Sequence, residues 1–248
     1  MTYHYATPRR PITDAIRKMV ISDFPEIALI PDIDMQDKVV EAWSYALCCS
    51  DFSRITEIPP EGNPGAPVLV QGTQADHIRG VMRYTRAIAL EFEQAYPQTQ
   101  IDWSILLAGA ACHDVGKPYE FDPANRKRWA ECPAQSGAPT FRHSVFGMHV
   151  CLMVGLPEEV AHIAVGHSLE GLHMGVSAEC TIVRQADHGW WHVAGALGLI
   201  TPESLGALSG NLRARPQRSE DQVGQSSGID HVSRGRGRGR TGSGNGSK

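Results

Sequence analysis

Residues 101–117, IDWSILLAGAACHDVGK, indicate the fold class and contain the first candidate site residues. Asp102 is a favourable helix N-cap, and the apolar run behind it continues to His113 with no proline and no strand-like alternation. Gly116 is a residue type that commonly ends a helix. His113 lies on the apolar stripe of this helix, with Asp114 beside it. The stretch therefore predicts a helix that directs an imidazole and a neighbouring carboxylate toward the core.

The sequence on both sides of this stretch follows the same helical pattern. Residues 54–72 and 117–142 each contain four prolines, which predicts two irregular connections. No segment shows a convincing strand alternation, so the predicted fold class is an all-α helical bundle. Besides the helix at 102–116, helices are expected at 12–19, 34–49, 73–96, 143–155, 157–168 and 177–198.

Composition divides the chain into three parts. Residues 1–72 are expected to form an N-terminal helical extension with a Pro/Gly-rich loop, residues 73–205 the main helical domain, and residues 206–248 a disordered Gly/Arg/Ser-rich tail. The tail carries a net charge of +5 and the rest of the chain −9. An acidic body is a poor partner for nucleic acid. The RG repeats of the tail are compatible with a weak RNA-binding arm, but their composition favours a solubilising tail.

The overall composition is that of an ordinary globular protein, with 42% hydrophobic and 20% charged residues. The chain has no run of 18 apolar residues, which argues against a membrane span. Its first residues lack the apolar core of a signal peptide. The six cysteines form no C-x-x-C pair and are expected to be reduced and mostly buried. These features predict a cytoplasmic protein, and they leave its oligomeric state open.

Six side chains on the apolar stripes of the predicted helices form a candidate metal site. Two of them are carboxylates, and a buried carboxylate is costly without a counter-charge. Imidazole and carboxylate groups without thiolate suit one or two divalent ions of Fe, Mn, Zn or Co. The candidate ligands are His77, His113, Asp114, His143, His167 and Asp187.

Other histidines lie off these stripes. His149 and His162 point away from the stripes of their helices, and Cys112 is rotated away from His113, which favours a packing role. His188 and His192 also lie off the Asp187 face. Their i, i+4 spacing is able to hold zinc, but exposed helix residues are the favoured interpretation.

The pattern of His77, His113–Asp114 and Asp187 resembles the H…HD…D signature of the HD-domain metalloproteins, which are all-α. HDVGK at 113–117 resembles their H-D-x-G-K form. HSVFGMHVCLMVGLPEEVAHIAVGHS at 143–168 is similar to the H-x-x-x-G…L-P-x-x-V…H block of their dinuclear branch. The resemblance covers residues 73–198 and places an HD metal-binding domain over 73–205.

The resemblance implies two metal ions that share one carboxylate. The first ion would be held by His77, His113, Asp114 and Asp187, and the second by Asp114, His143 and His167. Members that act on cyclic dinucleotides often have His-His-Glu where this chain has residues 167–170, HSLE, and they carry a G-Y-P motif that is missing here. These departures argue against a cyclic dinucleotide substrate.

The resemblance also implies a metal-dependent hydrolase. Its most common reaction is cleavage of a phosphoester in a small metabolite or nucleotide by a metal-bound hydroxide. Asp114 and Lys117 are the candidate catalytic residues. Lys117, just after the helix end, and Arg142, beside His143, are candidate contacts for an anionic substrate.

Three alternatives remain open from the sequence. One is a diiron HD-domain oxygenase that cleaves a C–C or C–P bond with O2, and another is a non-enzymatic sensor of a small ligand. The third is a hydrolase of a non-phosphate substrate, bound in an aromatic pocket. Aromatic residues available for such a pocket are Trp103, Trp129, Phe141, Phe146, Trp190 and Trp191.

Overall fold

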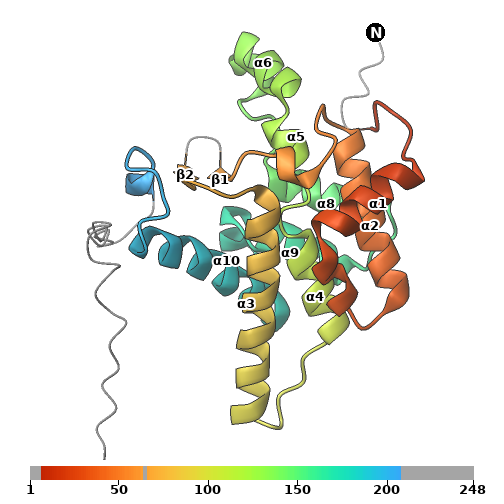
Figure 1. The fold of residues 1–248 in the computed structure, drawn as a ribbon, viewed down its shortest axis with the longest axis vertical. Helices are drawn as coiled ribbons and strands as arrows, with labels where there is room; N and C mark the ends of the chain where they lie inside the picture. The colour runs from red at the N-terminus through yellow and green to blue at the C-terminus, as the bar shows by residue number, and fades with distance from the viewer. Residues whose placement is uncertain (1–6, 64–65, 208–248) are drawn as a thin grey trace, which may run out of the picture. The chain divides into compact units, whose positions relative to one another are not determined.

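The computed structural model describes residues 7–63 and 66–207, and helices dominate it (Figure 1). The predicted all-α class is confirmed. The tail predicted at 206–248 lies outside the described residues apart from its first two positions. The helices that carry the candidate site all fall within the predicted ranges: α3 (Gln74–Ala95), α4 (Trp103–Cys112), α8 (His143–Met153), α9 (Glu158–Gly166) and α10 (Ala178–Ala196).

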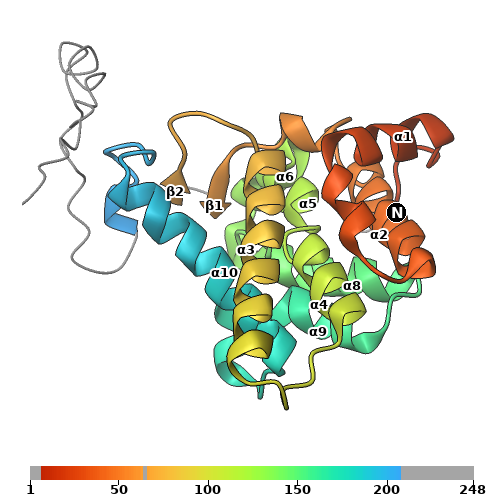
Figure 2. The ribbon, with the colours of Figure 1, turned by 60° about the horizontal axis from the view of Figure 1, so that its bottom comes forward.

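Helix α4 is the central element of the bundle. It packs against α3, α9 and α10, and α9 in turn packs against α8 (Figures 1 and 2). Gly109 permits the close approach of α9, because a side chain at this position would overlap Ile163. Gly116, in the turn after α4, passes directly against the backbone carbonyl of His143. This contact brings the turn that carries His113 and Asp114 to the start of α8.

Polar caps set the starts of these helices. The Asp102 carboxylate accepts hydrogen bonds from the backbone N–H groups of Ser104 and Ile105, as the sequence predicted. Thr73 and Asp76 form a reciprocal capping box at the start of α3. The box fixes the first turn of the helix that carries His77.

The described N-terminal residues pack onto the bundle. This region contains α1 (Asp14–Asp23), the 3₁₀ helix η1 (Pro25–Leu29) and α2 (Ile33–Cys48). Helix α2 contacts α4, α8 and the short helix α5 (Lys117–Phe121). The buried indole of Trp43 donates to the carbonyl of Ala111 at 3.0 Å, two residues before His113. The N-terminal region therefore supports the helix that leads into the candidate site.

The two proline-rich segments are more regular than predicted. Residues 117–142 contain α5 (Lys117–Phe121), α6 (Pro123–Glu131) and α7 (Pro133–Ser136). The prediction of an irregular connection was wrong here because the prolines Pro118, Pro123 and Pro133 occupy the first turns of helices. Proline is favourable there, since these N–H groups have no partner within the helix.

Residues 54–72 contain the 3₁₀ helix η2 (Ile55–Glu57) and an antiparallel hairpin of β1 (Glu61–Asn63) and β2 (Ala66–Val68). In the hairpin, Glu61 pairs with Val68 and Asn63 with Ala66. The segment after α10 holds this hairpin. Thr201 donates to the Val68 carbonyl at 2.8 Å, and the Ser204 hydroxyl accepts from the Val68 N–H at 2.9 Å. These long-range contacts explain why sequence periodicity did not reveal the strands.

The remaining described elements are the short helices η3 (Leu169–His173) and η4 (Leu205–Ala207). All six cysteines are free thiols, and five of them are buried, as predicted. Within residues 7–63 and 66–207, the helices lack the combination of length and apolar character needed to cross a bilayer.

Candidate metal centre

The six predicted ligands come together in two groups of three. Within each group the potential ligand atoms lie within 4.8 Å of one another. The His77 Nε2 and the Asp187 Oδ1 are 3.3 Å apart. Five of the side chains are buried, and Asp187 is partly buried. The groups are His77, His113 and Asp187, and Asp114, His143 and His167.

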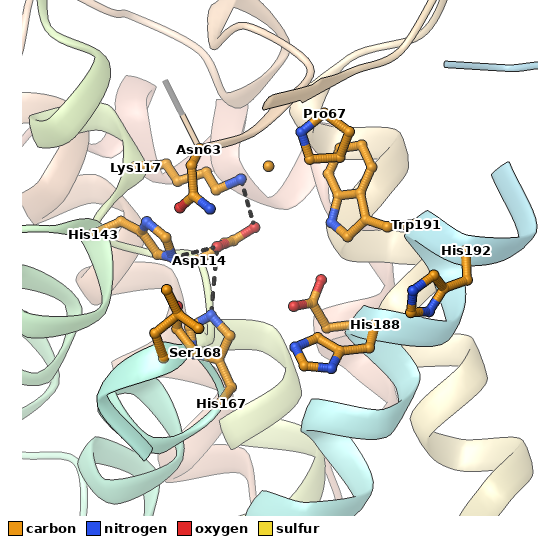
Figure 3. Close-up of a pocket in the computed structure, with 13 residues that line it drawn as sticks. Asn63, Pro67, Asp114, Lys117, His143, His167, Ser168, His188, Trp191 and His192 are labelled. Carbon is orange, nitrogen blue, oxygen red and sulfur yellow. Dashed lines mark ion pairs between the residues drawn. The ribbon is translucent and has the colours of Figure 1, made fainter. Parts of the chain in front are cut away.

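Asp114 presents one carboxylate oxygen to each group, and Figure 3 shows it beside His143 and His167 of the second group. Its Oδ2 is 3.2 Å from Nε2 of His77 and 3.3 Å from Nε2 of His113. Its Oδ1 is 3.5 Å from Nε2 of His143 and 3.8 Å from Nε2 of His167. This arrangement allows one carboxylate to serve both groups.

Helix ends orient two of the histidines. His113 and His167 directly follow the last residues of α4 and α9, where backbone carbonyls lack helical partners. Nδ1 of His113 lies 2.8 Å from the Ala110 carbonyl, and Nδ1 of His167 lies 2.9 Å from the Ala164 carbonyl. A carbonyl only accepts, so each Nδ1 carries a proton. In the neutral ring, Nε2 is then a free ligand atom.

A carboxylate on α5, Glu120, orients a third histidine. Its Oε2 lies 2.5 Å from Nδ1 of His143 and accepts from the His143 backbone N–H at 3.1 Å. Burial opposes ionisation of Glu120, but the hydrogen bonds from His143 outweigh it and lower the Glu120 pKa. Sequence analysis missed Glu120, because it lies in a segment expected to be irregular and belongs to no recognised motif.

The donor atoms of both groups fit a bound cation. With Nδ1 protonated, the Nε2 atoms of His113, His143 and His167 are lone-pair acceptors. They face the oxygens of Asp114 at 3.3–3.8 Å. Acceptors that face acceptors repel one another unless positive charge lies between them. Divalent ions that accept imidazole and carboxylate ligands would supply that charge.

The electrostatics at Asp114, Asp187 and His167 favour the protonation states that metal ligands need. At His113, by contrast, burial opposes the charged form, but Asp114 and Asp187 outweigh it and raise the pKa. Burial opposes the charge on Asp114, but Lys117 and the histidines hold its pKa well below the usual range. Burial also opposes ionisation of Asp187, but the hydrogen bond from His77 outweighs it and lowers the Asp187 pKa. Burial lowers the pKa of His167 to about 3, so its ring is neutral. Ionised carboxylates and neutral imidazoles bind metals.

Lys117 lies beside the shared carboxylate. Its ammonium is 3.2 Å from Asp114 Oδ2 and donates to the carbonyl of Glu61 in β1 at 2.5 Å. The amide of Gln74 donates to the same Oδ2 at 2.7 Å. Sequence analysis did not identify Gln74, because a glutamine in the first turn of a helix usually faces solvent. The structure shows it buried against the centre.

Arg142 is engaged with protein groups. Its guanidinium donates to Oδ1 of Asn63 at 2.6 Å and to Oγ of Ser168 at 3.2 Å, and it pairs with Glu170 at 3.4 Å. Asn63 and Ser168 line the cavity described below, whereas Arg142 does not. Arg142 therefore supports the cavity wall through its hydrogen bonds to two lining residues, Asn63 and Ser168.

A cavity of about 290 Å³ opens onto the two groups. The β1–β2 hairpin contributes Pro67 to its lining, and α10 contributes Trp191 (Figure 3). Of the aromatic residues proposed for a pocket, Trp191 is the one that lines this cavity. His188 and His192 line it as well, although helical phase had placed them off the Asp187 face.

An all-α bundle with a carboxylate shared between two His/Asp groups defines this protein as a helical metal-binding protein. Residues 75–188 match the family model described as HD domain, so the chain contains an HD domain over these residues. The His/Asp groups fit an HD-type metal site. Comparisons with curated proteins and with solved structures gave no match.

Replacing the shared carboxylate tests the centre directly. We expect Asp114→Ala to lower bound metal by tenfold or more, because it removes one oxygen from each group. Elemental analysis of protein purified without chelator measures this. His162→Ala is the matched control, since His162 accepts a hydrogen bond from the Ser177 N–H and lies outside both groups. Full metal occupancy in Asp114→Ala would contradict the ligand assignment.

The Glu120–His143 contact predicts a weaker effect on metal affinity. Replacing a group that orients a ligand histidine typically costs about 10–100-fold in metal affinity. We expect a loss of this size in Glu120→Ala, and a smaller loss in Glu120→Gln, whose amide oxygen still accepts from Nδ1. Titration of the metal-free protein with Mn²⁺ or Zn²⁺ gives the affinities, with the exposed Glu159→Gln as control. Equal affinities in Glu120→Ala and wild type would rule out this orienting role.

Proposed function

We propose that this protein is a metal-dependent hydrolase that cleaves a phosphoester in a small metabolite or nucleotide. The observation that carries the proposal is the position of Asp114, which offers one oxygen to each of two ligand groups at the base of an open cavity. The match of residues 75–188 to the HD-domain model supports it, because that family consists mostly of metal-dependent hydrolases.

The proposed centre holds two divalent ions of Fe, Mn, Zn or Co. When bound, such a pair lowers the pKa of water and polarises phosphoryl oxygens. Asp114 would contribute to both sites. The ligands are His77, His113, Asp114 and Asp187 for one ion, and Asp114, His143 and His167 for the other.

The protein's own side chains bind and orient the substrate in this proposal. The Lys117 ammonium lies at the cavity floor beside Asp114, where it would bind an oxygen of an anionic group. Arg142 acts indirectly by holding Asn63 and Ser168 in the wall. Trp191 is largely buried and forms an apolar part of the cavity wall on the α10 side.

The reaction class is tested by assaying phosphate release under anaerobic conditions. The protein is loaded with Mn²⁺, Zn²⁺ or Fe²⁺, its metal content is measured, and a panel of phosphomonoesters and nucleotides is supplied. We expect release without O2, and loss of release in Asp114→Ala. Substrate cleavage that consumes O2 stoichiometrically would overturn the proposal in favour of an oxygenase. Ligand binding without turnover by the metal-loaded protein would overturn it in favour of a sensor.

Lys117 gives a second, independent prediction. Removing a charged hydrogen bond to an anion costs about 1.5–3 kcal/mol, which corresponds to roughly 10–100-fold. We expect Lys117→Ala to raise KM for the substrate by that factor while most of the metal is retained, as steady-state kinetics and elemental analysis would show. Lys127→Ala, at an exposed position on α6, is the control. An unchanged KM would remove Lys117 from substrate binding.

A further inference from the structure

The side of the cavity formed by α10 carries two histidines that the metal centre does not use. His188 and His192 are one turn apart on one face of the helix, and both line the cavity. Figure 3 shows them on α10, with Trp191 on the same helix and Lys117 and His143 on the other side of the view. Both side chains are exposed.

These two imidazoles differ from the ligand histidines in their contacts. His113, His143 and His167 each have Nδ1 bound to a protein acceptor. Within the described residues, His188 and His192 make no hydrogen bond or ion pair. A neutral imidazole offers one N–H donor, and a protonated one offers two. Donors are therefore available to a ligand in the cavity.

The charges of the cavity lining favour an anion. Among the described lining residues, the carboxylates are Asp114 and Asp187, and both belong to the candidate metal groups. Apart from the candidate ligands His143 and His167, the remaining ionisable side chains of the lining are Lys117, His188 and His192. A ligand that extends from the centre toward α10 thus meets imidazole N–H donors, and among the described lining residues no further carboxylate repels it.

A zinc site at the same pair is a weaker interpretation. Their i, i+4 spacing suits two ligands of one ion, but a structural zinc site needs four ligands and a catalytic one three. Among the described residues, the groups of three or more potential ligand atoms include neither His188 nor His192.

We propose that His188 and His192 form a second anion subsite that binds a carboxylate at the far end of the substrate. The proposal rests on the proposed function, because it takes the phosphoryl group of the same molecule to lie at the metal centre and Lys117. Lys117, His188 and His192 line the same cavity, so one small molecule could place an anionic group at each end of it. The substrate class is then a small phosphorylated carboxylic acid.

Binding of phosphonates tests the subsite without requiring turnover. Metal-loaded protein is titrated calorimetrically with phosphonocarboxylates of two to five carbons and with alkylphosphonates of the same lengths. We expect the carboxylate to tighten binding about tenfold at one chain length. His188→Ala and His192→Ala should remove that gain and leave the affinity for the alkylphosphonate unchanged. His173→Ala is the control, since His173 is exposed on η3 and does not line the cavity.

The outcomes separate this inference from the function on which it rests. Equal affinity of wild type for both probe series would overturn the subsite while leaving the phosphoryl site intact. A gain that persists in the His188→Ala, His192→Ala double variant would show that another group binds the carboxylate, and it would also overturn the subsite. If neither series binds to metal-loaded protein, the phosphoryl site is absent and both proposals fail.

Discussion

The buried carboxylate of Asp114 is the constraint around which the rest of the site is arranged. An ionised carboxylate that is almost fully buried must be paired. Lys117 and Gln74 donate to one of its oxygens, but the Nε2 atoms of three of the surrounding histidines are oriented as acceptors: His113, His143 and His167. The protein donors therefore satisfy only one oxygen of Asp114, and the lone pairs of the histidines can be satisfied by bound cations. Bringing these side chains together requires α3, α4, α8, α9 and α10 to end or pass at one place.

The orientation of the histidines arises largely from local helix geometry. His113 and His167 each bond the carbonyl three residues earlier, a group that is available because the helix ends there. A ligand position just after a helix end is thus oriented by its own backbone. His143 begins a helix instead and has no such carbonyl, so its orientation depends on Glu120 from a different element. The group of Asp114, His143 and His167 therefore depends in part on a contact between distant segments.

These differences explain what the sequence could predict. Helical periodicity located the helices and the six candidate ligands, because burial of one stripe imposes a 3.6-residue repeat. It could not reveal Glu120 or the hairpin, which depend on contacts between distant segments. It also misjudged the prolines of residues 117–142, whose effect depends on their position in a helix turn. His188 and His192 were predicted to be ordinary exposed residues from their angular position on the helix. That position identifies residues that face a core, whereas a wider arc of the helix can line a cavity.

The two sides of the cavity differ in how firmly their polar groups are held. At the base, protein acceptors hold Nδ1 of three ligand histidines, Lys117 pairs with the shared carboxylate, and Arg142 fixes the wall at Asn63 and Ser168. On α10, His188 and His192 are exposed and make no polar contact with other described residues. A reaction centre gains from rigidity, because its ligands must keep one geometry. In the proposed subsite, selectivity needs only donors that a substrate can reach. Substitution of His188 or His192 would therefore alter substrate preference at little cost to the candidate metal ligands.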